Sequence, residues 1–333
     1  MSLRKTDTDM NLNEFKETFS KLIGSHDSFI LTTHENSDGD GVGAEVALSL
    51  YLEWFGKHVK IINHDKPPTN CEFLHFESKV YTEIDSIEKD TLVIMVDYNE
   101  IDRIGKRLIP LLTSGNQIIR IDHHKKPEKI ARSISYVDDT ASSTCEIVYN
   151  IIEDDLIKFP SDIQQKVALA LYAGIIFDTN NFANKNVSSR TFEVCSELVR
   201  YGADNNLAYK KLFENRITQE LKLLGETLSS IEEYNDGKIV MYTTTQRMLK
   251  DCGLSVEVTE GFSKDVKPTN GREIVVYIRE TGKNTFRVSL RSEHRDVQKI
   301  AEHFGGGGHL LASGFRAKMT IEDLKSELLT VLT

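Results

Sequence analysis

The chain of 333 residues is poor in several features that would assign it to a class. It has only four cysteines, which form no C-x-x-C pair: Cys71, Cys145, Cys195 and Cys252. This usage is typical of a reducing compartment rather than of a disulfide framework, so we expect a cytoplasmic protein. No run approaches about 18 apolar residues and the N-terminal segment is polar, so we expect no transmembrane helix, no signal peptide and no membrane partner.

Basic residues are outnumbered by acidic ones, because the chain has 41 Lys and Arg and 51 Asp and Glu. The formal net charge is −10. A long nucleic acid needs many neutralised phosphates, so this balance disfavours such a partner but permits a small phosphorylated ligand in a local basic pocket. The chain has 6 prolines and 39% hydrophobic residues, which excludes a disordered or low-complexity protein. At roughly 150 residues per domain, the length predicts about two domains.

The first half of the sequence alternates strand-like and helix-like segments. Strand patterns occur at Ser28–Thr33, His58–Asn63, Thr91–Val96 and Gln117–Ile121, and Val42–Phe55 has the clearest helical spacing. Continuous apolar strands are typical of parallel sheets that are covered on both faces. The pattern therefore predicts an α/β fold whose N-terminal parallel sheet has helices on both faces.

The second half changes character twice. Residues from Ser161 to about Ser230 are mostly helical, and Arg216–Glu232 is a long amphipathic stretch that we interpret as a connector. Strand patterns then return and alternate with short helices, which predicts a smaller C-terminal α/β domain. We therefore expect a catalytic domain over 1–200, a helical connector over 201–232 and a substrate-binding domain over 233–333.

Acidic and histidine side chains follow three of the predicted strands at once. They are His34, Asp38 and Asp40 after the first strand, Asp97 after the third, and Asp122, His123 and His124 after the fourth. Because loops at the carboxyl ends of parallel strands line one crevice, we expect these side chains to converge. Carboxylates packed so closely raise one another's pKa, and a divalent cation removes that conflict. Oxygen ligands with some imidazole favour Mn, Mg or Fe(II) over a thiolate-type zinc site.

A further acid, Asp178, ends the apolar helical stretch Val167–Phe177. A carboxylate is unfavourable at the negative end of a helix dipole, so this position favours a cation partner. Taken singly, these acids also fit plainer roles: Asp38 and Asp40 suit a turn and a helix N-cap, and Asp178 suits an acid that faces solvent. Their joint occurrence after buried segments favours a metal site.

In this order, the motifs resemble those of the DHH phosphoesterase family. The resemblance rests on H-x-x-x-D-x-D at His34–Asp40, on the strand-terminal Asp97, on D-H-H at Asp122–His124 and on the later Asp178. The glycine-rich segment Gly305–His309 is similar to the signature of the family's DHH-associated C-terminal domain. The motifs cover almost the whole chain, and its two-domain length resembles the nano-RNase/pAp phosphatase branch.

The resemblance implies a site with two divalent ions, for which Mn(II) is favoured and Mg(II) or Fe(II) are alternatives. It implies six metal ligands: His34, Asp38, Asp40, Asp97, His123 and Asp178. The first two would hold one ion, Asp40 with His123 and Asp178 would hold the other, and Asp97 would bridge them. Two such ions clamp the attacking and leaving oxygens of an in-line displacement.

The resemblance also implies catalytic and substrate-binding roles. His124 would face the substrate phosphate and Asp122 would orient a histidine. In the second domain, Arg291 matches the family's substrate-binding position, and Ser292 follows it at the end of a predicted strand. Arginine offers bidentate contacts to phosphate. Arg190 is a weaker candidate from the first domain, because an arginine on a helix face is more commonly solvated.

The predicted C-terminal domain contains four consecutive glycines, Gly305, Gly306, Gly307 and Gly308, followed by His309. Glycines allow backbone N–H groups to approach a phosphate closely, although the run also fits a flexible hinge. The histidine suits a phosphate contact or stacking on a base. Residues 264–299 carry nine Lys or Arg and five Asp or Glu, a local excess of positive charge on an acidic protein.

These observations predict a manganese-dependent phosphoesterase that hydrolyses short oligoribonucleotides and 3′-phosphoadenosine 5′-phosphate (pAp) through a metal-activated water. One alternative is a phosphodiesterase for cyclic di-AMP or its linear product pApA, which shares this layout. An alternative from another class is a nucleotide-sensing module without turnover. Inorganic pyrophosphatase and a processive RecJ-type nuclease fit less well, because the C-terminal signature and the chain length disagree. The sequence leaves a homodimer open.

Overall fold

The computed structural model divides the chain into two compact units, Met1–Asn215 and Arg216–Thr333. The structure describes residues 10–74, 80–84, 86–98, 100–124, 130, 133–269 and 271–332. Among these residues, no helix combines the length and the apolar character that crossing a bilayer requires. Each unit has its own sheet and its own apolar core, so each is described by itself.

The first unit is built on a six-stranded sheet with the order β3-β2-β1-β4-β5-β6, in which all neighbours are parallel. Its strands are β1 (Ser28–Thr32), β2 (His58–Ile62), β3 (Val80–Tyr81), β4 (Leu92–Val96), β5 (Ile118–Asp122) and β6 (Ser133–Val137). The strand order reverses between β1 and β4. Open α/β sheets bind ligands at such a switch point, beyond the carboxyl ends of the strands.

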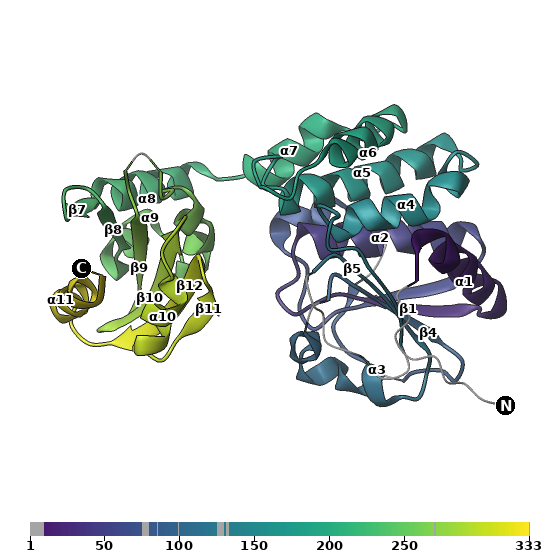
Figure 1. Ribbon diagram of the computed structural model, residues 1–333, viewed down its shortest axis with the longest axis horizontal. Helices are drawn as coiled ribbons and strands as arrows, with labels where there is room; N and C mark the ends of the chain where they lie inside the picture. The colour runs from purple at the N-terminus through teal and green to yellow at the C-terminus, as the bar shows by residue number, and fades with distance from the viewer. Residues whose placement is uncertain are drawn as a thin grey trace. The chain divides into compact units, whose positions relative to one another are not determined.

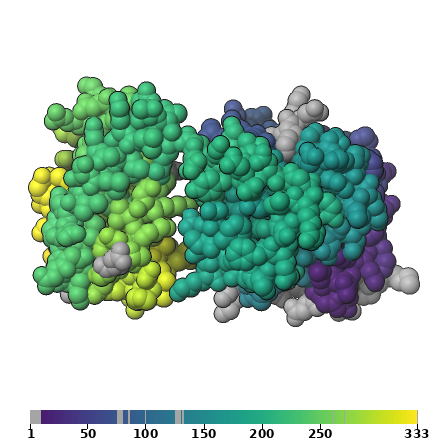
Figure 2. Space-filling view, turned by 90° about the horizontal axis from the view of Figure 1, so that it is seen from above, coloured from purple at the N-terminus to yellow at the C-terminus, as the bar shows by residue number. Residues whose placement is uncertain are grey.

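Helices cover both faces of this sheet, which confirms the predicted fold class (Figure 1). One face carries α1 (Leu12–Ser25), α2 (Gly39–Trp54), α4 (Thr144–Leu156) and α5 (Ser161–Asp178), with α6 (Ser189–Arg200) and α7 (Asn205–Phe213) packed outside them. Figure 2 shows the outer surface of this layer in teal and green. The other face carries the short helix α3 (Ile109–Thr113) and the 3-10 turns η2 (Ile101–Ile104) and η3 (Lys106–Leu108).

The apolar run of β4 shows why this strand is buried on both faces. Leu92, Ile94 and Val96 pack into the core beneath the large helical layer, whereas Val93 and Met95 pack toward the opposite face. Alternate side chains of a strand point to opposite faces, so only an unbroken apolar run satisfies both cores. The chain therefore leaves the sheet at Asp97 directly from the most buried part of the unit.

The helices α2, α4 and α5 lie unusually close together because glycines form their contacts. A Cβ atom on Gly43 would lie 2.5 Å from the carbonyl oxygen of Ala170, and one on Gly174 would lie 2.2 Å from Cys145 Sγ. A side chain at either position would therefore force the helices apart. This packing brings the first turn of α2, which carries Asp40, against the beginning of α4.

One predicted helix forms differently. The spacing around Arg103–Leu112 predicts a single helix, but the structure has η2, η3 and then α3 there. Gly105 has φ +74° between the two 3-10 turns, and Pro110 stands in the first turn of α3. A left-handed residue interrupts the helical hydrogen bonds and proline suits only a helix start, so the segment breaks into short turns.

The second unit is a smaller α/β domain, as predicted. Its mixed sheet has the order β11-β12-β10-β9-β8-β7, in which only the pair β8 and β9 is parallel. The strands are β7 (Glu232–Tyr234), β8 (Ile239–Thr244), β9 (Ile274–Gly282), β10 (Thr285–Ser292), β11 (Gly307–His309) and β12 (Ala312–Lys318). The glycine run, which the sequence predicts as an interruption, thus contributes an edge strand.

Two groups of helices cover this second sheet on opposite faces. On one face lie α8 (Thr218–Ser229), α9 (Gln246–Cys252) and the 3-10 segment η4 (Val256–Lys264), and on the other lie α10 (Val297–His303) and α11 (Ile321–Leu332). The amphipathic stretch that we interpret as a connector contains α8, whose buried Leu223 packs with Val240 and Tyr242 of β8.

Candidate active site

The loop after β1 places the first group of predicted site residues at the beginning of α2. Asp38 is the N-cap of this helix, and its Oδ1 accepts hydrogen bonds from the backbone N–H of Asp40 (3.0 Å) and of Gly41 (3.4 Å). Its other oxygen, Oδ2, lies 3.9 Å from Nε2 of His34. Asp38 thus serves as a cap with one oxygen, while the other faces the side chains that converge here.

Asp97 lies at the centre of the cluster. It follows β4 in a left-handed conformation (φ +60°) and is 3% exposed. Its Oδ2 lies 3.5 Å from Nε2 of His34, whereas its Oδ1 lies 3.6 Å from Nε2 of His123 and 3.5 Å from Nδ1 of His124. The two carboxylate oxygens therefore face histidines from different loops.

Asp40 and Asp178 lie on the His123 side of the cluster. The Oδ2 atoms of these two acids lie 3.9 Å and 3.7 Å from Nε2 of His123. Asp40 also accepts backbone hydrogen bonds from Thr144 (2.7 Å) and Cys145 (2.9 Å), in the first turn of α4. A helix N-terminus has unpaired N–H groups and a positive partial charge, so it stabilises a carboxylate there.

The three imidazoles and four carboxylates are far apart in the sequence and meet at the switch point of the sheet. Asp122, by contrast, is fully buried, and its Oδ1 accepts hydrogen bonds from Nδ1 (2.8 Å) and from the backbone N–H (3.2 Å) of His124. The Asp122 carboxylate therefore fixes the orientation of the His124 ring and leaves its Nε2 as the available nitrogen. Asp122 lies beneath the cluster rather than in it.

Burial and neighbouring charges raise the pKa values of several carboxylates in the cluster. Burial first, and then the charges of Asp97 and Asp178, raise the pKa of Asp40 to about 8. Burial also raises the pKa of Asp178 to about 6, against the lowering effect of the His123 charge, and burial and Asp97 raise the pKa of Asp38. Without a cation, these acids hold protons at pH values where an ordinary aspartate has lost them.

The pKa values of Asp97 and of the histidines shift in the directions expected of ion pairs. Burial alone would raise the pKa of Asp97, but hydrogen bonding to His34 and the charges of three imidazoles hold it at about 2. Burial likewise opposes the charged form of His124, and its hydrogen bond to Asp122 overcomes this and raises the His124 pKa to about 9. The pKa values of His34 and His123 are also raised, against burial, by neighbouring aspartates.

The donor set fits a metal ion. Two groups have ligand atoms that all lie within 4.8 Å of one another: His34 with Asp38 and Asp97, and Asp97 with His123 and His124. Burial first, and then repulsion from neighbouring carboxylates, raise the pKa of Asp40 and Asp178, and a divalent cation would relieve both effects. Both groups include Asp97. Because the Nδ1–H of His124 donates to Asp122, the better nitrogen ligand on that side is Nε2 of His123.

The second unit places Arg291 and His309 on one face of its sheet. Both are opposite Ala312 of the strand between them, β12, so the three residues form one row. Arg291 is half-buried, which lowers its pKa, and its guanidinium donates to the Leu290 carbonyl oxygen (3.0 Å). Ser292 is the next residue along β10 and therefore lies outside this row. Its buried hydroxyl donates to the Glu273 carbonyl oxygen (2.7 Å).

Three of the four glycines are required by the backbone alone. A Cβ atom on Gly306 would lie 2.2 Å from the Gly314 carbonyl oxygen, and one on Gly308 would lie 2.6 Å from Cα of Ser313. Gly305 has φ +73°, which favours glycine. Among the described residues, no heavy atom lies within 4 Å of a Cβ placed on Gly305 or on Gly307. Gly307 differs from Gly305 in that its φ is not positive, so its backbone does not require glycine.

Arg190 contacts two acids that are not members of the aspartate and histidine cluster. This residue of α6 places Nη1 3.3 Å from Oδ2 of Asp138 and Nε 3.6 Å from Oε1 of the buried Glu146. These contacts give the arginine a structural partner on each side. Sequence reasoning also missed residues that contact the cluster, among them Thr144, Cys145, Asn186 and Arg103. Nη2 of Arg103 lies 2.7 Å from Nδ1 of His34.

The missed contacts had only weak sequence signals. Asn186 donates to Oδ2 of Asp178 (3.4 Å) and to the Ser142 carbonyl oxygen (2.7 Å), and Ser142 is distant in the sequence. The capping pattern from Ser143 to Glu146 predicts a helix that starts there and runs to about Glu153. Which acid occupies that helix start is set by the packing of α2 against α4, which no local pattern encodes.

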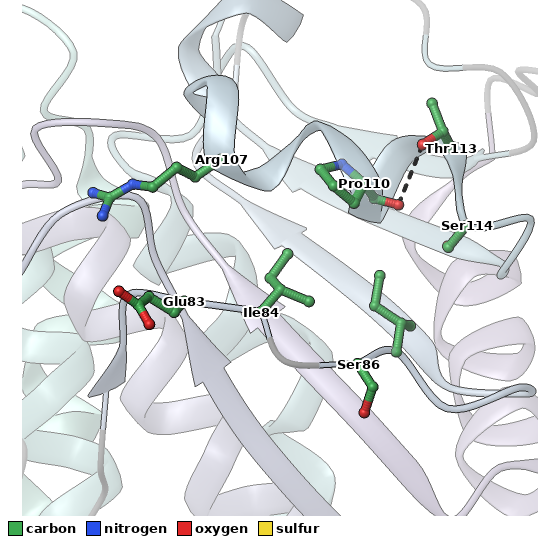
Figure 3. A pocket seen from close by; sticks show the side chains of 8 residues that line it. Glu83, Ile84, Ser86, Arg107, Pro110, Thr113 and Ser114 are labelled. Atoms are coloured by element: carbon green, nitrogen blue, oxygen red, sulfur yellow. Dashed lines mark hydrogen bonds between the residues drawn. The ribbon is translucent and has the colours of Figure 1, made fainter.

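A separate pocket of about 680 Å³ lies between the segment after β3 and α3 (Figure 3). Its lining includes Ile84, Ile87 and Pro110, with Glu83 and Arg107 at one side. None of the predicted site residues lines it. The Arg107 guanidinium donates to the His64 carbonyl oxygen, which gives this arginine a structural role.

Comparison with known proteins identifies the family. The model for the N-terminal domain of the DHH family matches residues 28–175, and the model for the DHHA1 domain matches residues 236–333. The chain belongs to the DHH phosphoesterase family. This confirms the resemblance drawn from the motifs, and the chain is a phosphoester hydrolase of the NrnA branch.

Relatives and a solved structure extend the likeness over both units. The chain is 28% identical to the probable bifunctional oligoribonuclease and PAP phosphatase NrnA of Streptococcus mutans, over 96% of this chain and all of that protein. It is 25% identical to the cyclic-di-AMP phosphodiesterase PdeA of Listeria monocytogenes, over 98% of this chain and 50% of that protein. An exopolyphosphatase-related protein from Bacteroides fragilis has a similar structure, with a TM-score of 0.84, 25% identity and 95% of each chain covered.

Proposed function

We propose that this phosphoester hydrolase acts on short oligoribonucleotides and on pAp, using two divalent ions. The observation that carries the proposal is the position of Asp97, whose two oxygens face His34 on one side and His123 on the other. A carboxylate held in this way is suited to bridge two cations. Mn(II) is the favoured ion, because the donors are oxygen with some imidazole.

The proposed ligands divide into two sets around that bridge. His34 and Asp38 would hold one ion, and Asp40, His123 and Asp178 would hold the other. When bound, two such ions supply a water of lowered pKa and neutralise charge on the phosphoryl oxygens. The burial of Asp40 (1% exposed) and Asp97 keeps competing water from their carboxylates, which strengthens their hold on a cation.

His124 has the contacts of a residue that handles charge on the substrate. Its Nδ1–H donates to the buried Asp122, so the ring is fixed in one tautomer with Nε2 turned away from that acid. Against the effect of burial, the hydrogen bond to Asp122 and the charge of Asp97 raise the pKa of His124 to about 9 when no cation is bound. A charged ring at this position would stabilise the phosphoryl oxygens or donate a proton to the leaving oxygen.

In the second unit, Arg291, His309 and the open position Gly307 would bind the substrate. The arginine has donors for a phosphate, the exposed histidine offers a ring for stacking or a phosphate contact, and the glycine leaves open space where a side chain would stand. A short substrate needs only a few such contacts, which agrees with the net charge of −10. The S. mutans relative, named for both activities, supports this substrate class.

A turnover assay separates this proposal from its rival. Purified protein is freed of metal with a chelator, resupplied with Mn(II), and given pAp, a 5-mer RNA or cyclic di-AMP. We expect release of phosphate from pAp and of mononucleotide from the 5-mer, with none from cyclic di-AMP. Turnover of the cyclic dinucleotide alone would instead support the alternative that the L. monocytogenes relative suggests.

A further inference from the structure

We propose that Thr144 is a positioning residue, which holds the carboxylates of Asp97 and Asp40 in the arrangement that binds two ions. Its hydroxyl donates to Oδ1 of Asp97 (3.3 Å), and its backbone N–H donates to Oδ2 of Asp40 (2.7 Å). One residue of α4 thus contacts an acid from the loop after β4 and an acid from the first turn of α2. This inference rests on the proposed function.

Among the residues that the structure describes, the Thr144 hydroxyl donates to Asp97 and does not cap its own helix. The side chain is fully buried in the first turn of α4, where the capping hydrogen bond is made by Ser143, whose Oγ accepts from the backbone N–H of Glu146 (3.1 Å). At this position valine would fill the same volume. A buried hydroxyl needs a hydrogen-bond partner, and Asp97 accepts the hydrogen bond of this one.

This contact determines how the Asp97 carboxylate is turned. Oδ1 receives the hydroxyl and faces His123, so Oδ2 is left to face His34. Rotation of the carboxylate plane would remove one oxygen from one side and convert a bridging ligand into a ligand of a single ion. The N–H contact to Asp40 couples the same residue to the His123 side, so Thr144 aligns both acids at once.

A group that orients a metal ligand affects metal binding more than it affects the stability of the fold. Loss of such a partner typically lowers metal affinity or activity roughly 10- to 100-fold. We therefore expect Thr144→Val to weaken Mn(II) binding, measured by electron paramagnetic resonance of the free ion, by about 10- to 100-fold. At limiting Mn(II), kcat falls by a similar factor, while KM for pAp stays within about twofold because the hydroxyl touches no substrate group.

Matched variants isolate the hydroxyl from the volume of the side chain. Thr144→Ser and Thr144→Ala both lose the methyl group and differ only in the hydroxyl. We expect Mn(II) affinity within about threefold of wild type for the serine variant and a loss like that of valine for the alanine variant. Thr227→Val is the control, because it removes a buried hydroxyl from the second unit, where Thr227 bonds Thr244 Oγ1 (2.8 Å).

The outcomes distinguish this inference from the proposed function. If the wild-type protein binds no Mn(II), the two-ion function itself fails. If the wild type binds Mn(II) and the serine and alanine variants bind it equally well with equal kcat, the positioning role of Thr144 is overturned and the function stands. Thermal unfolding in chelator shows whether any variant has lost its fold, in which case the serine and alanine pair decides.

Discussion

The candidate functional residues of the two units differ in their burial and in their charge. In the first, Asp97 and Asp40 are buried with other ionisable groups, and their pKa values move to about 2 and about 8. In the second, Gly307 and His309 are exposed on an edge strand, and only Arg291 is half-buried. The acidic side chains of the first unit favour cations, whereas Arg291 and His309 of the second unit present hydrogen-bond donors that suit an anion. Under the proposed function, catalysis would belong to the first unit and substrate recognition to the second.

The largest effect is expected from a substitution in the aspartate and histidine cluster of the first unit. Asp97→Ala removes the carboxylate common to both ligand sets, so we expect kcat to fall by roughly 10³-fold, on the order of 4 kcal/mol. The fold should persist, because neighbouring strands and helices hold the sheet independently of this side chain. Steady-state kinetics with pAp and Mn(II) measures the loss, and circular dichroism checks the fold.

The control for this variant is Asp27→Ala. Asp27 precedes β1 at the opposite end of the strand, is 90% exposed and pairs with Lys57. It should keep wild-type turnover, since surface ion pairs contribute little. If Asp97→Ala retains more than about a tenth of wild-type activity, the assignment of a bridging carboxylate is wrong.

A smaller effect is expected from the second unit. Arg291→Ala removes a phosphate contact that is made equally in the ground and transition states, so KM for pAp should rise about tenfold with kcat nearly unchanged. Arg247→Ala, which removes an arginine that is 90% exposed on α9, serves as the matched control. An unchanged KM in the first variant would exclude Arg291 from substrate binding.

The smallest effect is a pH dependence of stability that only the first unit should show. The folded-state pKa values of Asp40 and Asp178, about 8 and about 6, lie above the ordinary aspartate value of 3.8. Raised values contribute stability below the unfolded pKa, and this stability is lost as pH rises through the folded pKa. The free energy of unfolding in chelator should therefore fall between about pH 5 and about pH 8.

Denaturant titrations at several pH values, with and without Mn(II), test this expectation. Saturating Mn(II) should restore stability most at the alkaline end, since a bound ion replaces the protons that these acids otherwise hold. Asp40→Asn should flatten the pH slope of the chelated protein. Stability that rises with pH across this window in chelator would contradict the electrostatic account of the site.

The sequence predicts the parts of the fold that depend on local pattern. Apolar runs such as that of β4 and acids at strand ends such as Asp97 are visible without coordinates, because burial on two faces demands an unbroken run. The helices at Val297–His303 and Ile321–Leu332 also form where the pattern predicts them. Convergence of the strand ends follows from the rule for parallel sheets, and the structure brings those side chains together.

Features set by tertiary packing were not accessible in this way. The Thr144 contact to Asp40 spans about a hundred residues and depends on the close approach of glycines such as Gly174. Ser292 follows Arg291 directly, yet alternation along the strand turns its hydroxyl to the opposite face. The glycine run reads as a loop, and only the neighbouring strand β12 explains why Gly306 has no room for a side chain.

The most direct test of the central claim is a count of bound Mn(II) on the metal-free protein near pH 8, with turnover of pAp measured on the same samples. The account predicts about two ions per chain, activity that is absent in chelator and returns with the ions, and loss of at least one bound ion in Asp97→Ala. A wild-type protein that binds no Mn(II), or that hydrolyses pAp at full rate in chelator, would contradict it.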